Sequence, residues 1–236
     1  MILNNSWQWL NVEETTSTND LVKKYNIPPE AKALIITAKR QTAGRGRRGR
    51  QWISQTGNLF FSQLISTDID ISKLTFVTSV SIAETLSDLT NGLTIGIKWP
   101  NDVLVNNKKI CGILIEQADN GNVIIGVGVN LKSHPDNRDI IYPTTDLASL
   151  GFSISCKDFL QNYLSKFDNN MNICQQDFAL IRQKWLEHAL YINSLIKVSL
   201  KDIVEEGIFK GIDEQGLLLL ETNSSIKKIA AGDVFL

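Results

Sequence analysis

The spacing of apolar residues changes near residue 191, and this change limits the fold more than any other feature of the chain. Before it, strand-like runs alternate with helical patterns, the longest over residues 72–89, where apolar residues recur every third position. After it, residues 195–236 contain only short apolar runs separated by glycines. We therefore predict an α+β chain with two domains, residues 1–190 and residues 191–236, the second a small all-β barrel.

The composition is that of a soluble globular protein. Of 236 residues, 43% are apolar and 21% are charged, which suffices for a core without disulfide or metal staples. No apolar run approaches the roughly 20 residues of a membrane span, and no secretory signal is recognisable, so we expect a cytoplasmic protein without membrane attachment. The cysteines, Cys111, Cys156 and Cys174, are odd in number and far apart, which predicts reduced thiols. With only two histidines, the composition argues against a His/Cys zinc site.

The basic residues are unevenly distributed. The net charge is −1, yet six of the 24 basic residues lie between Lys39 and Arg50, so the rest of the chain has 18 basic against 25 acidic residues. Such a chain has no general attraction for nucleic acid or membranes but contains one concentrated anion-binding segment.

This segment also contains glycines in a G-x-G-x-x-G pattern, at Gly44, Gly46 and Gly49. The pattern does not predict a dinucleotide fold, because a helix must then follow, whereas residues 51–65 are strand-like. Glycines let backbone N–H groups approach a ligand, and arginines bind carboxylates and phosphates. We predict a loop that wraps an anion, with a solvated basic loop or a nucleic-acid contact as the alternatives.

Two further segments place polar side chains at strand ends. Lys98-Trp99-Pro100-Asn101-Asp102 interrupts a strand, although a simple polar turn has the same pattern. In the strand predicted over residues 109–116, alternation places Lys109, Cys111 and Ile113 on one face and Gly112 on the other. Lys109 then begins a largely apolar face, where its ammonium needs an anionic partner. We expect Cys111 to be a buried apolar residue and not a nucleophile.

Together these segments resemble biotin protein ligases. The resemblance rests on Ser17-Thr18-Asn19, on the GRGRRGR loop with Trp52, on KWPND at 98–102, on KKICGILIE at 108–116 and on GVGVN at 126–130. It implies a mixed sheet flanked by helices, related to class II aminoacyl-tRNA synthetases, with an SH3-like C-terminal domain. It also implies that the protein joins biotin to ATP with Mg²⁺, forming biotinyl-5'-AMP, and transfers biotin to a lysine of a biotin carboxyl carrier domain.

The resemblance further implies the residues of the site. The biotin pocket would comprise Ser17, Thr18, Asn19, Gln41, Gly44, Arg45, Gly46, Arg47, Lys109 and Gly112. The ATP site would comprise Arg48, Trp52, Asn101 and Asn130. The catalytic residues would be Lys109, Arg45, Arg48 and Asp102, with Asp102 also a ligand of the metal ion. Lys109 would contact both the biotin carboxylate and the α-phosphate, while the glycine loop folds over them.

Some alternatives remain open. Only six residues precede Trp7, so we expect no N-terminal winged helix-turn-helix and no operator DNA binding, whereas a homodimer is an expectation of the family. A lipoate ligase would use the same adenylate chemistry, but its RRxxGGG stretch is absent. An RNA-binding module that uses the basic loop with Trp52 is the rival from another functional class. An adaptor built on residues 195–236 would leave most of the chain without a role.

Overall fold

The structure is a computed structural model that describes residues 2–3, 7–119, 121–135, 142–200, 203–223 and 225–235. The chain divides into two compact units, one of residues 1–71 with 107–162 and the other of residues 72–106 with 163–236. No helix within the described ranges is both long and apolar enough to cross a membrane.

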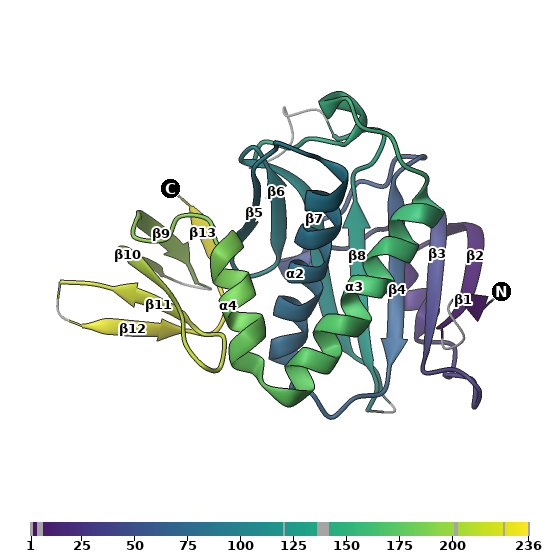
Figure 1. The fold of residues 1–236 in the computed structure, drawn as a ribbon, viewed down its shortest axis with the longest axis horizontal. Helices are drawn as coiled ribbons and strands as arrows, with labels where there is room; N and C mark the ends of the chain where they lie inside the picture. Colours follow the sequence, from purple (N-terminus) through teal and green to yellow (C-terminus); the bar gives the residue numbers. More distant parts are fainter. Residues whose placement is uncertain are drawn as a thin grey trace. The chain divides into compact units, whose positions relative to one another are not determined.

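The first unit contains a mixed sheet (Figure 1). Its strands are β1 (Ile2–Leu3), β2 (Trp7–Thr15), β3 (Ala33–Gln41), β4 (Leu59–Ile65), β7 (Lys108–Gln117) and β8 (Val123–Val129). They lie in the order β1-β2-β3-β4-β8-β7, with β2 and β3 parallel and the other pairs antiparallel. Every residue of β4 and β8 is buried, which explains why β8 is apolar throughout and why β4 is apolar except at Ser62 and Gln63.

One short helix, α1 (Thr18–Val22), lies against β3, β4 and β8. Its Val22 belongs to a buried cluster with Leu34, Leu64 and Ile124. The side chain of Ser17, at the N-cap of this helix, makes no capping hydrogen bond.

The second unit contains α2 (Ile71–Leu89), the hairpin of β5 (Ile95–Lys98) and β6 (Asp102–Val105), and most of the helices α3 (Cys156–Gln176) and α4 (Phe178–His188). Its aromatic core forms around Phe76, whose ring meets Phe178 and Trp185 edge-on at centroid distances of 5.8 and 5.5 Å. The helix predicted over residues 72–89 is confirmed. Strand β6 was not predicted, because its residues follow directly on the polar turn of the KWPND segment.

The C-terminal strands form a separate antiparallel sheet. They are β9 (Leu195–Ser199), β10 (Val204–Ile212), β11 (Leu218–Glu221), β12 (Ile226–Ile229) and β13 (Asp233–Phe235), in the order β12-β11-β10-β9-β13. Within the described part of this region, no strand pairing closes the sheet into a barrel. The mixed sheet with helices and the C-terminal β domain confirm the predicted fold class.

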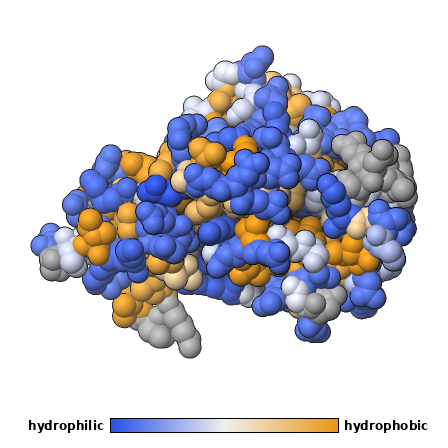
Figure 2. Space-filling view, turned by 60° about the horizontal axis from the view of Figure 1, so that its bottom comes forward, coloured by the Kyte–Doolittle hydropathy of each residue, from blue (hydrophilic) through white to orange (hydrophobic). Residues whose placement is uncertain are grey.

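The surface carries few large apolar side chains. Figure 2 shows a face that is mostly hydrophilic, with hydrophobic atoms in separate spots. Half of the exposed large apolar residues belong to the C-terminal strands or the segment before β10: Leu195, Ile203, Val204 and Ile226. Scattered exposure of this kind is normal for a folded protein and identifies no interface by itself.

Candidate active site

The buried polar end of the site forms where β2 passes into α1. Thr18 donates from its backbone N–H and from its hydroxyl to Oε1 of Gln41, at 2.8 and 3.2 Å. Ser62 on β4 donates its hydroxyl, which can reach either Oγ1 of Thr18 at 2.8 Å or Oδ1 of Asn19 at 2.5 Å. Ser17, Thr18, Asn19 and Ser62 are all buried. The structure therefore brings Thr18, Asn19 and Gln41 together as predicted, and adds Ser62, which belongs to none of the motifs.

Three glycines on β7 and β8 leave room for the side chains of Asn19 and Trp52 to lie directly on the sheet backbone. Gly112 pairs with Gly128 across β7 and β8, and Leu114 pairs with Gly126. A Cβ atom on Gly126 would lie 2.1 Å from Oδ1 of Asn19, and one on Gly128 would lie 2.4 Å from the Trp52 indole. A Cβ atom on Gly112 would lie 2.7 Å from the same indole. The sheet is bare of side chains here, and Asn19 and Trp52 contact its backbone.

Lys109 lies beside this bare area. Its ammonium is 5.4 Å from the centroid of a Trp52 ring, a cation–π distance, and 3.3 Å from the place of a Cβ atom on Gly112. The predicted alternation, which put Lys109 and Gly112 on opposite faces, was therefore wrong at this point.

The alternation fails because β7 changes partners at its start. Lys109 pairs with Thr144 in the loop after β8, whereas the pairing with β8 begins at Cys111. The two residues that follow Lys109, Ile110 and Cys111, are both fully buried. Cys111 is a reduced, buried cysteine, as expected.

The glycine loop folds back on itself as a narrow turn. Gly46 donates its N–H to the carbonyl of Arg50 at 2.7 Å, and Trp52 donates to the carbonyl of Gly44 at 2.9 Å. A Cβ atom on Gly44 would lie 2.6 Å from the Trp52 carbonyl, so this close approach requires glycine. Only a 3-10 turn, Arg47–Gly49, lies in the loop. This agrees with the rejection of a dinucleotide helix.

The loop arginines differ in their surroundings. Arg45 lies against the carboxylates of Asp20 and Glu116. Arg48 adopts a left-handed backbone conformation with φ of 55°, which turns the chain inside the loop. Arg47 is partly buried, and Arg48 is exposed. Arg45, which we expect to contact the ligand, lies between two acidic side chains in this structure.

Asn130, at the end of β8, has an unused acceptor. It is 1% exposed, and its Nδ2 donates to the carbonyl of Thr145 at 3.1 Å. Its Oδ1 is buried and accepts no hydrogen bond from the described residues. A buried carbonyl oxygen of this kind requires a donor, and the exocyclic amino group of adenine is one.

The KWPND segment forms the turn between β5 and β6 in the second unit. The Lys98 ammonium lies 3.8 Å from a carboxylate oxygen of Asp102, and both residues are buried. The two residues pair directly across the hairpin, so the turn between them comprises Trp99, Pro100 and Asn101. Among the described residues, no group of three or more His, Cys, Asp or Glu side chains could hold a metal ion.

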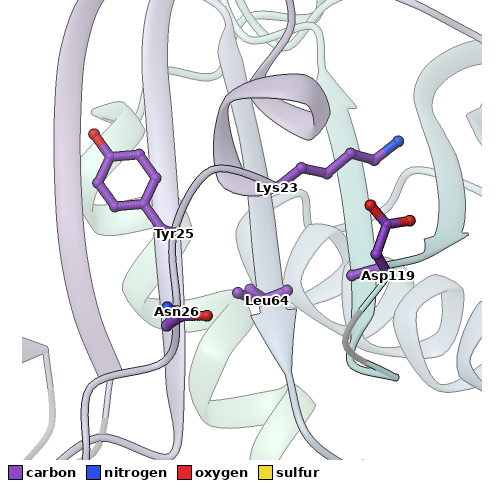
Figure 3. A pocket seen from close by; sticks show the side chains of 6 residues that line it. Lys23, Tyr25, Asn26, Leu64 and Asp119 are labelled. Carbon is purple, nitrogen blue, oxygen red and sulfur yellow. The ribbon is translucent and has the colours of Figure 1, made fainter.

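One pocket in the first unit lies apart from these residues (Figure 3). It has a volume of about 190 Å³ and is lined by Lys23, Tyr25, Asn26, Leu64, Ala118 and Asp119. Lys23 and Asp119 extend to one side of it and Tyr25 to the other. Since none of the predicted site residues lines this pocket, it is not the candidate active site.

The fold is a mixed sheet with a buried polar cluster, a bare glycine surface and a basic loop, and comparison with known proteins places the chain in one family. Residues 11–130 match the model of the biotin/lipoate A/B protein ligase family, and residues 191–236 match that of the biotin protein ligase C-terminal domain. The chain therefore belongs to the biotin protein ligase family, as the sequence resemblance predicted.

Individual relatives agree over most of the chain. The bifunctional ligase/repressor BirA of Bacillus subtilis (strain 168) is 35% identical over 223 residues, with 89% of this chain and 67% of the relative covered. A biotin--[acetyl-CoA-carboxylase] ligase of Paracoccus denitrificans is 32% identical, with 94% and 97% covered. The structure of biotin protein ligase from Aquifex aeolicus in complex with biotin and ATP matches with a TM-score of 0.86 at 29% identity, and 97% of each chain is covered.

Proposed function

We propose that this protein is a biotin protein ligase. The biotin carboxylate attacks the α-phosphate of ATP, which forms biotinyl-5'-AMP and releases pyrophosphate. The ε-amine of a lysine on a biotin carboxyl carrier domain then attacks the acyl carbon, an amide forms, and AMP leaves with the proton balance taken up by solvent. The single observation that carries this proposal is the buried polar cluster of Thr18, Asn19, Gln41 and Ser62 beside the bare glycine surface.

The chemistry of the cluster suits the ureido ring of biotin. This ring offers one carbonyl oxygen and two N–H groups, and the cluster presents hydroxyl and amide groups that both donate and accept. A site built to hydrogen-bond such a group rejects analogues that lack it, because its buried polar atoms would be left unpaired. Lipoate has a dithiolane ring without these groups, so we favour biotin over the lipoate alternative.

We assign the charged residues to the adenylation step. Lys109 stabilises the negative charge that develops between carboxylate and α-phosphate, and Arg45 and Arg48 neutralise carboxylate and phosphates from the loop. Trp52 packs against the bound adenylate, and Asn130 accepts from adenine through its unused Oδ1. Gly44, Gly46 and Gly112 let the backbone approach the ligand.

The remaining assignments follow the pattern of the family. Asn101 and Asp102 serve the nucleotide and the incoming lysine. Asp102 would hold the Mg²⁺ ion together with the phosphates of ATP, and the ion would screen the phosphate charge. The carrier domain is the acceptor, and cytoplasmic location and homodimer formation are part of the proposal. The C-terminal domain is taken as residues 191–236, supported by the strands from Leu195 onward.

The test is transfer of labelled biotin to a purified carrier domain with MgATP, with lipoate as competitor and a control without ATP. We expect labelling of one carrier lysine that requires ATP and resists excess lipoate. Labelling with lipoate alone would replace the proposal by lipoate ligation. If the folded protein labels no carrier but binds RNA at physiological salt regardless of biotin and ATP, the RNA-binding alternative is correct.

A further inference from the structure

A cluster of charged residues connects the glycine loop to the polar end of the pocket. Nη1 and Nη2 of Arg45 each lie 3.0 Å from an oxygen of Glu116, one on either carboxylate oxygen. Nη2 also lies 2.6 Å from Oδ1 of Asp20 on α1. Glu116 is on β7, so a single loop side chain is held by the helix and the sheet at once. Paired arginine–carboxylate contacts of this geometry fix orientation as well as distance.

Glu116 has a second partner inside the pocket. Nδ2 of Asn19 donates to Oε2 of Glu116 at 2.8 Å, and the same amide reaches the carbonyl of Leu114 at 3.5 Å. With its Nδ2 on Glu116, Asn19 presents its Oδ1 to Ser62. Glu116 therefore determines which way the Asn19 amide faces. Its carboxylate accepts hydrogen bonds from Asn19 in the pocket and from Arg45 in the loop.

Glu116 and Arg45 each stabilise the charged form of the other. Burial disfavours the charge of Glu116, but hydrogen bonds from Arg45 and Asn19 outweigh it and hold the pKa of this carboxyl below its usual value. Lys23, whose ammonium is 3.6 Å from Oε2, acts in the same direction. The hydrogen bond with Glu116 raises the pKa of the Arg45 guanidinium in turn.

We propose that Glu116 is a positioning residue that couples the closed glycine loop to the biotin pocket, with Asp20 as the second anchor of Arg45. The inference rests on the proposed function, because it takes biotin as the ligand of Asn19. It changes the role of Arg45: its charge is matched by two carboxylates, so Arg45 holds the loop in place, and binding of the anionic groups is assigned to Arg47, Arg48 and Lys109. Asp20 and Arg45 are more exposed than Glu116, so Glu116 contributes most.

The test compares Glu116→Gln with a matched control. Glutamine keeps an acceptor for Asn19 but cannot hold Arg45 through two charged oxygens. We expect the Kd for biotin to rise about tenfold, as for loss of one charge-assisted contact, with a smaller change in kcat at saturating biotin. Asp20→Asn should raise the Kd less. Glu14→Gln removes an equivalent pair with Arg40, at 2.9 Å on an exposed part of β2 and β3, and should leave the Kd unchanged.

Loop closure is measured separately by trypsin cleavage after Arg47, Arg48 and Arg50. Biotin should protect these sites in the wild type and in Glu14→Gln, but much less in Glu116→Gln. The effects of Arg45→Gln and Glu116→Gln on the Kd should not add, since both break the same contact. A folded Glu116→Gln protein with wild-type Kd and wild-type protection would overturn the positioning role. Failure of the wild type itself to bind biotin would instead refute the proposed function.

Discussion

Gly126→Ala should weaken biotin binding by about 10- to 150-fold, because the added methyl group displaces Asn19. A Cβ atom at position 126 would lie 2.1 Å from Oδ1 and 2.8 Å from Cγ of Asn19. A carbon and an oxygen in contact are separated by about 3.3 Å, so the Asn19 side chain would have to move by about 1.2 Å. β8 is fully buried and paired on both sides, so the strand itself has little freedom to move away.

The magnitude follows from the contacts that Asn19 would lose. Its amide donates to Glu116 at 2.8 Å and its carbonyl accepts from Ser62 at 2.5 Å. A hydrogen bond to a charged group contributes about 1.5–3 kcal/mol, and the orientation it fixes is what biotin requires. Since 1.4 kcal/mol corresponds to a factor of ten in Kd, loss of this one orientation gives the expected range.

The assay is calorimetric titration of biotin into the wild type, Gly126→Ala, Asn19→Ala and the double variant. The double variant should bind no more weakly than Asn19→Ala, because the methyl group acts through Asn19. Gly207→Ala is the control: its Cβ would lie 2.4 Å from the Glu221 carbonyl in the C-terminal sheet, so Tm should fall with the Kd unchanged. Wild-type affinity in a folded Gly126→Ala protein, or strictly additive effects, would refute the reasoning.

Three other perturbations test separate parts of the structure. Lys109→Ala should keep its Tm but lose at least about 90% of ATP–pyrophosphate exchange, and wild-type exchange would remove Lys109 from the mechanism. Burial opposes the charge of Asp146, yet hydrogen bonds with His134 and Ser149 hold its pKa below the usual value. The contribution of this carboxylate to the free energy of unfolding is complete above its unfolded-state pKa of about 3.9 and is lost as the pH falls through its folded-state pKa. In Asp146→Asn the free energy of unfolding should therefore fall less steeply with decreasing pH. The same pH dependence in the variant and in the wild type would contradict this. Asn170 is fully buried and makes hydrogen bonds with Glu84 and Lys184. Asn170→Ala should therefore lower the free energy of unfolding in urea by about 2–4 kcal/mol. A loss below about 1 kcal/mol would show that Glu84 and Lys184 remain satisfied without Asn170.

The sequence predicted the long elements of the fold better than the short ones. Residues 72–89 form a helix whose apolar residues recur at helical spacing over many turns, so that the pattern alone indicates the helix. The five residues of α1 have no such periodicity, and their position depends on the bond from Thr18 to Gln41 on another strand. Strand β6 follows a polar turn and has only four residues, so its pairing with β5 decides its state.

Family motifs indicated more of the candidate site than sheet register did. Thr18, Asn19 and Gln41 were named through these motifs; in the structure Thr18 bonds Gln41, and Ser62 reaches both Thr18 and Asn19. Ser62 enters only because β4 pairs with β8 in a register that sets it opposite Gly126. Glu116 follows the KKICGILI run, yet nothing local indicates that its partner is an arginine 71 positions away. Contacts of this range depend on tertiary structure, which a local pattern does not record.

The pairing of the basic segment also bears on the RNA alternative. At least three of its six cations lie on carboxylates: Lys39 on Glu13 at 2.8 Å, Arg40 on Glu14, and Arg45 on Asp20 and Glu116. A cation already matched by a carboxylate releases no counterion when it meets a phosphate, so this segment would neutralise at most about three phosphates. With about 0.7 counterion per contact on single strands, the salt slope of RNA binding would be no steeper than about −2, against about −4 for six contacts. A segment of this strength suits the phosphates of one nucleotide held in a buried site better than the backbone of a polymer.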